Sequence, residues 1–196
     1  MNRSMDYGIS RLVSVAAQAA LITVFTCTFG VKTADAQSTA PANHGQNASS
    51  ADHKFASEAA SGGMAEVKLG ELAQQKAASE KVKEFGQRMV TDHSKAGEQL
   101  KQVAQQENLN LPQRLSREDQ ATYDRLSKLN GKQFDEAYTR TMLTDHQKDI
   151  SEFEKEASTG KDPELKQFAS RTLPTLKEHM KLAHEMSRET TSASMQ

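Results

Sequence analysis

A helical repeat of apolar residues is the feature that most constrains how this chain can fold. From about residue 52 to residue 186, apolar side chains recur at spacings of three and four, which is the period of one face of an α-helix. The same stretch lacks the alternation of apolar and polar residues that is typical of a half-buried strand. We therefore expect an all-helical (all-α) domain.

Start and stop signals divide this stretch into four long helices and one short one. Ser79 can cap the second long helix, Ser116 with Asp119 resembles a capping box, and Asp162-Pro163 pairs a cap with proline at the first helical position. The expected helices span about 52–78, 80–107, a short segment from 117 to 130, 132–158 and 163–186. Four long amphipathic helices bury their stripes most simply as a four-helix bundle, here two long hairpins joined by a connector that carries the short helix.

The two ends of the sequence differ from this helical region. Residues 1–36 read as a cleavable signal peptide: basic residues come first, a largely apolar run follows, and Ala34-Asp35-Ala36 matches a signal-peptidase site. An uncleaved anchor is the alternative interpretation. Residues 37–51 are rich in Ser, Ala and Asn and predict a flexible linker, and residues 187–196 predict a disordered tail. We therefore expect a bundle over 52–186, exported to the periplasm or cell envelope.

The charge balance argues against nucleic acid and anionic lipid as partners. Of 25 basic and 26 acidic residues, the first 36 positions hold three and two, so 22 and 24 remain, a net charge of about −2. This balance gives no basic footprint for nucleic acid and no basic helical face for anionic lipid. We expect no nucleic acid partner and no strong membrane binding after cleavage, and the sequence leaves the oligomeric state open.

Each long helix carries one potential metal ligand on its apolar stripe. These are Glu66 in the first, His93 in the second, His146 in the third and His179 in the fourth, each three or four residues from apolar neighbours. Counted from the hairpin turns, the four lie at similar depths, provided that both turns lie at the same end of the bundle. Three imidazoles and a carboxylate at one level predict a site for a transition metal ion such as iron, zinc or copper.

Other interpretations of these residues stay open. A histidine on an apolar stripe can be a hydrogen-bonded core residue, and Asp92 and Asp145, each next to one of these histidines, can support or replace a ligand. Met89 and Met142 lie one turn before two of the histidines and could add thioether ligands for copper, but filling gaps in the core is the favoured interpretation. His44 and His53 lie in or beside the linker, and we expect them and His184 on the surface.

Two runs of sequence carry a family resemblance. FASEAASGGMAEVKLGELAQQKAASEKVKEFGQRMVTDHSKAGEQL and MLTDHQKDISEFEKEASTGKDPELKQFASRTLPTLKEHMKLA resemble a family of exported bacterial proteins that are labelled as a domain of unknown function or as outer membrane proteins. That family is placed in the ferritin-like superfamily, so the resemblance implies a ferritin-like four-helix fold and an envelope location. It implies no activity. The Glu-x-x-His motif of di-iron bundles does not occur in the chain, which speaks against ferroxidase chemistry.

Three functions remain in view at this point. One is a non-enzymatic bundle that binds a metal or ligand through the four residues. Another is an interaction or stress-protective envelope protein with structural histidines and no metal. An enzyme is disfavoured, because the only cysteine lies in the expected signal peptide and no serine has a histidine at a spacing that suggests a nucleophile and its base.

Overall fold

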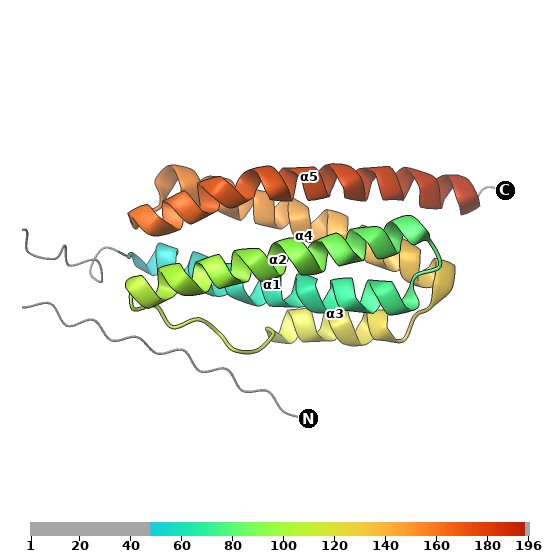
Figure 1. Cartoon of the computed structure of the whole chain (residues 1–196), viewed down its shortest axis with the longest axis horizontal. Coiled ribbons are helices and arrows are strands. Elements are labelled where there is room, and N and C mark those ends of the chain that lie inside the picture. The colour runs from blue at the N-terminus through green and yellow to red at the C-terminus, as the bar shows by residue number, and fades with distance from the viewer. Residues whose placement is uncertain (1–47, 195–196) are drawn as a thin grey trace, which may run out of the picture. The chain divides into compact units, whose positions relative to one another are not determined.

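Five α-helices make up the part of the chain that the structure describes. The structure is a computed structural model, and it describes residues 48–194, with side chains through residue 189. The helices are α1 (Ser50–Lys76), α2 (Glu80–Gln106), α3 (Arg117–Ser127), α4 (Gly131–Thr159) and α5 (Pro163–Ser194). No strand occurs among these residues, and the four long helices lie side by side (Figure 1). The all-helical prediction is confirmed.

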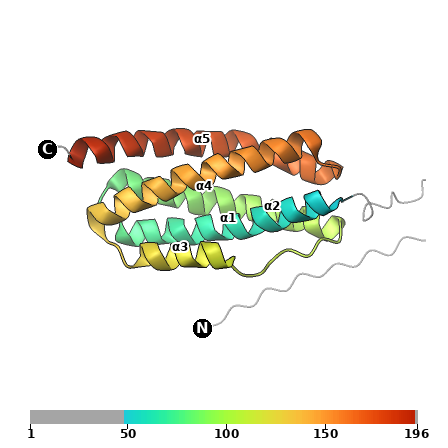
Figure 2. The same cartoon turned by 180° about the vertical axis from the view of Figure 1, so that it is seen from behind.

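The chain forms two antiparallel hairpins, α1–α2 and α4–α5, joined by a long connector. After α2, the connector and α3 run back along the outside of the bundle, so that α4 begins beside the α1–α2 turn (Figures 1 and 2). Hydrogen bonds confirm this order: Ser79 in the α1–α2 turn donates to Asp135 of α4, and Lys161 in the α4–α5 turn donates to Asp52 at the start of α1. The two turns therefore lie at opposite ends, and the assumption that they share one end is wrong.

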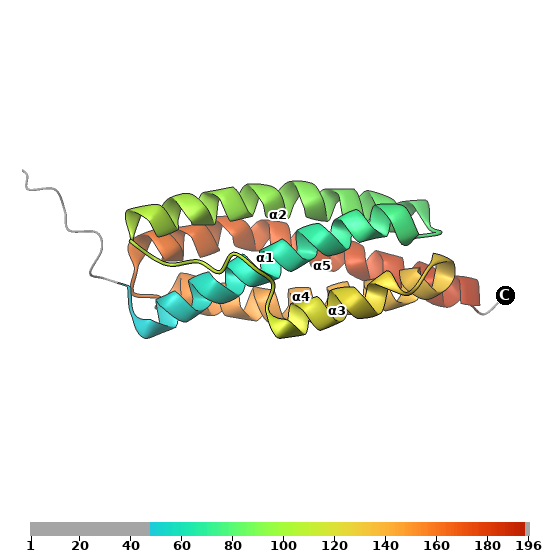
Figure 3. The same ribbon diagram turned by 90° about the horizontal axis from the view of Figure 1, so that it is seen from below.

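Hydrogen bonds fix the beginning of α1 and of α3. Ser49 and Asp52 form a capping box, so α1 begins at Ser50, inside the stretch that the sequence assigned to a linker. Ser116 caps α3 by accepting from the backbone N–H of Asp119 at 3.0 Å. The carboxylate of Asp119 accepts instead from the hydroxyl of Ser61, which in turn accepts from the N–H of Ser116. These hydrogen bonds connect α3 to α1, and Figure 3 shows α3 on the outside of the bundle.

The start of α2 differs from the sequence-based expectation. Ser79 occupies the cap position, but its side chain makes no capping hydrogen bond. The carboxylate of Asp135 accepts from the backbone N–H groups of Ala78 at 3.1 Å and Ser79 at 2.9 Å. A buried acid from another helix therefore satisfies this turn, which spacing within the α1–α2 segment alone could not reveal.

Two apolar clusters fill the bundle, one toward each end. Phe85, Met89, Phe134 and Tyr138 belong to the cluster beside the α1–α2 turn. The other cluster, beside the α4–α5 turn, is formed by the following residues: Phe55, Ala56, Leu100, Ala104, Leu109, Phe153, Leu165, Phe168, Ala169 and Leu176. On each long helix, the candidate metal ligand lies between the residues that belong to the two clusters.

The remaining expectations concern the ends of the chain. α5 continues to Ser194, past residue 186 where the sequence placed the end of the bundle. Residues 1–36, expected as a signal peptide, and the linker up to residue 47 lie outside the described residues. Within the described part, no helix combines the length and the apolar character needed to cross a bilayer.

Candidate metal centre

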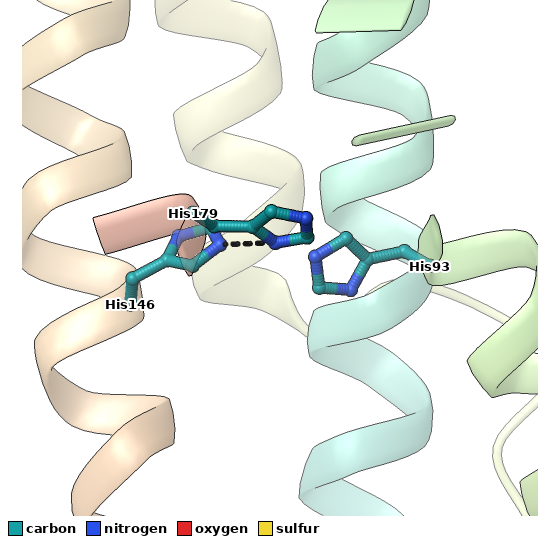
Figure 4. A group of neighbouring side chains, drawn as sticks. All are labelled: His93, His146 and His179. Atoms are coloured by element: carbon teal, nitrogen blue, oxygen red, sulfur yellow. Dashed lines mark hydrogen bonds between the residues drawn. The ribbon is translucent and has the colours of Figure 1, made fainter. Parts of the chain in front are cut away.

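The four predicted residues meet in the middle of the bundle, between the two apolar clusters. Glu66 comes from α1, His93 from α2, His146 from α4 and His179 from α5, and their exposed fractions are 3%, 6%, 0% and 0%. One ring nitrogen from each histidine lies within 4.8 Å of the others. Figure 4 shows the three imidazoles pointing toward one another. Each residue lies near the middle of its helix, so the direction in which the helix runs does not change its level.

Each imidazole also has a protein acceptor on its outer side. The Nδ1 of His93 lies 2.8 Å from Glu66 Oε2, and the Nδ1 of His146 lies 3.0 Å from the backbone carbonyl of Met142. The Nε2 of His179 lies 2.8 Å from Asp92 Oδ2. A carboxylate or carbonyl that accepts the outer N–H of a histidine is the usual support of a metal-bound imidazole.

The inner nitrogens face one another instead of an acceptor. The Nε2 of His146 lies 3.2 Å from the Nδ1 of His179, and the Nε2 of His93 is buried without a hydrogen-bond partner. If each outer nitrogen carries the proton, all three inner nitrogens present lone pairs to the same space. That is the donor arrangement that a cation requires.

The charge states of the group suit the same interpretation. Burial opposes the ionised form of Glu66, but His93 and His146 outweigh it and lower the pKa of this carboxyl to about 2. Burial lowers the pKa of His179 to about 4, against the opposing effect of Asp92, and it also lowers the pKa of His146. The carboxylate is therefore charged, while these two imidazoles favour the neutral form that metal binding needs.

His93 differs from the other two histidines. Burial is the largest single effect and disfavours the charged form, but the charge and the hydrogen bond of Glu66, together with the charge of Asp92, outweigh it and raise the pKa of His93. Its proton therefore lies on the side that faces Glu66. A metal ion at the inner nitrogen would take the place of any second proton on this ring.

The secondary candidates have separate positions. Asp92 supports His179 and also pairs with Arg88 at 3.3 Å, whereas Asp145 lines a cleft between α1, α3 and α4. Met89 and Met142 are fully buried in the apolar core, as gap-filling residues are. His53 and His184 are exposed, as expected, and His44 lies outside the described residues.

Sequence reasoning missed Asp149 and Tyr138. Burial first, and Glu66 next, raise the pKa of Asp149 well above its usual value, and its side chain lines a small cavity beside Glu66 and His93. Tyr138 is fully buried and its hydroxyl has no hydrogen-bond partner. Both lie on the helical face of His146, at spacings of three and eight residues, and that spacing could have indicated them.

Comparison with known proteins supplies a family and a fold. The sequence model of the family described as "Domain of unknown function (DUF4142)" matches residues 36–186. No curated protein matches the chain. The crystal structure of a DUF305 fragment from Deinococcus radiodurans is similar, with a TM-score of 0.63 and 14% sequence identity, over 72% of this chain and 99% of that one. At this identity the similarity concerns the fold alone. Because the family match spans most of its length, the chain belongs to the DUF4142 family of domains of unknown function.

Proposed function

We propose that this protein binds one transition metal ion through His93, His146 and His179 in the middle of its helical bundle. The observation that carries the proposal is the arrangement of the three imidazoles: the inner nitrogens share one buried space, and each outer nitrogen faces a protein acceptor. Glu66 then acts by supporting His93 and His146 from outside. This differs from its expected role as a direct ligand.

Proton counting supports a cation between the imidazoles. Without a metal, the 3.2 Å contact between His146 and His179 needs a proton, although the outer nitrogens of both rings already need one to meet Met142 O and Asp92. Two neutral rings supply only two protons for these three contacts. Either an additional proton or a metal ion must fill the third position.

The distances support the same proposal. Zinc–nitrogen bonds of about 2.0–2.1 Å place two imidazole nitrogens of a tetrahedral site about 3.3 Å apart. The 3.2 Å between His146 and His179 already matches that spacing. His93 lies at most 4.8 Å away, so its ring moves inward when the third bond forms.

Charge and ligand type limit the kind of ion. The carboxylates of Glu66 and Asp92 balance a buried divalent cation, because both touch the ligating rings. Imidazole suits zinc, copper and iron, and the only cysteine of the chain, Cys27, lies outside the described residues. We propose an ion of this group, with zinc as the probe.

The wider context is also part of the proposal. We infer export to the periplasm or envelope from the signal-peptide pattern of residues 1–36, and we infer no binding of nucleic acid from the balanced charge. A ferritin-like arrangement is supported by two antiparallel hairpins joined by one long crossover. We propose no catalytic reaction for this site.

A second candidate function is an interaction or stress-protective protein in which the histidines serve only the structure. The observation in its favour is that the Glu66–His93 and Asp92–His179 contacts, both 2.8 Å, already satisfy polar groups in the core without a metal. In that case the third proton lies between His146 and His179, and the site adds specificity to the packing instead of binding an ion.

Calorimetric titration with Zn²⁺, combined with thermal unfolding, separates the two functions. Metal binding predicts one ion per chain and a stabilisation of about 2.7 kcal/mol when free Zn²⁺ is 100 times Kd, reversed by chelator. His179→Gln should abolish both effects, while His184→Gln, on the exposed face of the same helix, should keep them. If Zn²⁺ leaves the unfolding temperature of the parent unchanged, the structural function is the correct one.

A further inference from the structure

An acidic cleft opens on the side of the bundle where α3 covers α1 and α4. It has a volume of about 250 Å³. Its walls carry seven acidic side chains and one lysine, which are those of Glu58, Glu66, Glu118, Asp119, Asp145, Asp149, Glu152 and Lys148. The raised pKa of Asp149 favours its neutral form, so the negative charge comes from the other six. A concave surface with so large an excess of one charge concentrates ions of the opposite sign.

The floor of the cleft is the carboxylate that touches the imidazoles. Glu66 lines the cleft although only 3% of the residue is exposed. Its Oε1 is buried, accepts no hydrogen bond, and lies 3.4 Å from the Nδ1 of His146. The cleft therefore ends at a negatively charged oxygen that accepts no hydrogen bond and lies beside the proposed metal ligand His146.

Glycine keeps the inner part of the cleft open. Gly62 lies inside α1, where glycine costs roughly 1 kcal/mol relative to alanine, and a Cβ at this position would meet no atom within 4 Å. Close packing against a neighbouring helix therefore does not explain the presence of glycine at position 62. Gly62 lines both the acidic cleft and a smaller cavity of about 20 Å³ beside Glu66 and His93, which is room for about one water molecule.

The opening on the other side of the bundle has a different charge. A cavity of about 160 Å³ between α2 and α5 reaches His93 and His179, but Lys95 and Arg171 line it together with a single carboxylate, Asp92. This side opposes the approach of a cation. The acidic cleft is the favourable one.

We propose that the acidic cleft binds hydrated divalent cations and is the path by which the metal ion reaches the three imidazoles. This inference rests on the proposed metal-binding function. Carboxylates hold hydrated divalent ions loosely, through oxygen ligands and water, so an ion can pass from the outer rim to Glu66 and then exchange water for imidazole nitrogen. The cleft sets the rate of uptake, and the imidazoles set the affinity.

Stopped-flow mixing of the metal-free protein with Zn²⁺ and a fluorescent zinc indicator tests this path. The test variant Glu58→Gln/Glu118→Gln/Glu152→Gln removes three charges from the rim of the cleft. The matched control Glu71→Gln/Glu98→Gln/Glu185→Gln removes three charges outside it. At low salt we expect the cleft variant to take up Zn²⁺ about 10-fold more slowly than the control. The difference should vanish near 1 M salt, where the screening length is about 3 Å.

Gly62→Leu provides a steric test without a change in charge. The larger side chain should slow uptake and release together and leave the equilibrium Kd unchanged, because it obstructs the path and not the ligands. If the cleft variant and the control bind Zn²⁺ with equal rates, the path is wrong while the metal site stands. If the parent protein binds no Zn²⁺ at equilibrium, the proposed function itself fails, and the path with it.

Discussion

The Nε2 of His146 lies 3.2 Å from the Nδ1 of His179 in the fully buried centre of the bundle. Both rings use their other nitrogen to contact an acceptor, the carbonyl of Met142 and the carboxylate of Asp92. If both outer nitrogens carry protons, the contact between the two rings needs a further proton or, as we propose, a metal ion. The following predictions test this centre and the bundle that positions it.

Asp92→Asn should weaken zinc binding by about 10–100-fold, because the neutral amide no longer supports the outer N–H of His179 with a charge. Asp124→Asn, on the exposed face of α3, is the control and should bind Zn²⁺ as the parent does. Competition with a chelator of known affinity measures both. Equal affinities for the two variants would contradict a supporting role for Asp92.

Asp135→Ala should destabilise the protein by about 1–3 kcal/mol, because the N–H groups of Ala78 and Ser79 lose their acceptor in a partly buried turn. Ser79→Ala should change the free energy of unfolding by less than about 0.5 kcal/mol, because this side chain makes no capping hydrogen bond. Urea unfolding measures both variants. A larger loss for Ser79→Ala would restore the capping role that the sequence suggested.

Gly63→Ala should raise the free energy of unfolding by about 0.5–1 kcal/mol, because alanine is the better helix former and a Cβ there meets no atom within 4 Å. Gly70→Ala should lower it by about 1–3 kcal/mol or more, because its Cβ would lie 2.5 Å from the carbonyl oxygen of Gly86 on α2. Thermal unfolding of the two variants should show shifts of opposite sign. A stabilised Gly70→Ala variant would show that α1 and α2 pack less closely than described.

Glu156 should make stability fall as pH rises. Burial first, and the neighbouring carboxylate of Asp52 next, raise the pKa of Glu156 from 4.5 to about 7 in the folded protein. The folded state therefore holds this proton more tightly than the unfolded state, and the stabilisation present below pH 4.5 is lost as pH rises through 7.

Glu156→Gln removes this titration, so its unfolding free energy relative to the parent should increase between pH 4.5 and 7. Glu154→Gln, an exposed position on the same helix, serves as the control. Urea unfolding at several pH values measures the differences. A constant difference between Glu156→Gln and the parent across this range would contradict the raised pKa.

Helical periodicity was enough to predict the helices and the faces that meet. Glu66, His93, His146 and His179 each follow apolar neighbours at spacings of three and four, and the structure brings all four together. The prediction that the four residues lie at one level along the bundle is correct although the two hairpin turns lie at opposite ends, because each residue is near the middle of its helix. A residue near a helix end would have moved to the opposite end of the bundle.

Contacts between distant segments could not be predicted. Asp135 satisfies the α1–α2 turn from another helix, and Ser61 completes the cap of α3 across more than fifty residues. No local pattern marks either partner. The contact of Glu66 with the outer nitrogens of the imidazoles could not be predicted either. Sequence spacing places a side chain on one face of a helix but does not tell which atom of a neighbouring ring it contacts.

X-ray absorption at the zinc edge of the reconstituted protein tests the central claim most directly. The account predicts one zinc ion with nitrogen and oxygen ligands at about 2.0–2.1 Å and the multiple-scattering signal of three imidazoles, both of which should be lost in His93→Gln. A spectrum with no imidazole signal, or one that His93→Gln leaves unchanged, would contradict a metal centre built from His93, His146 and His179.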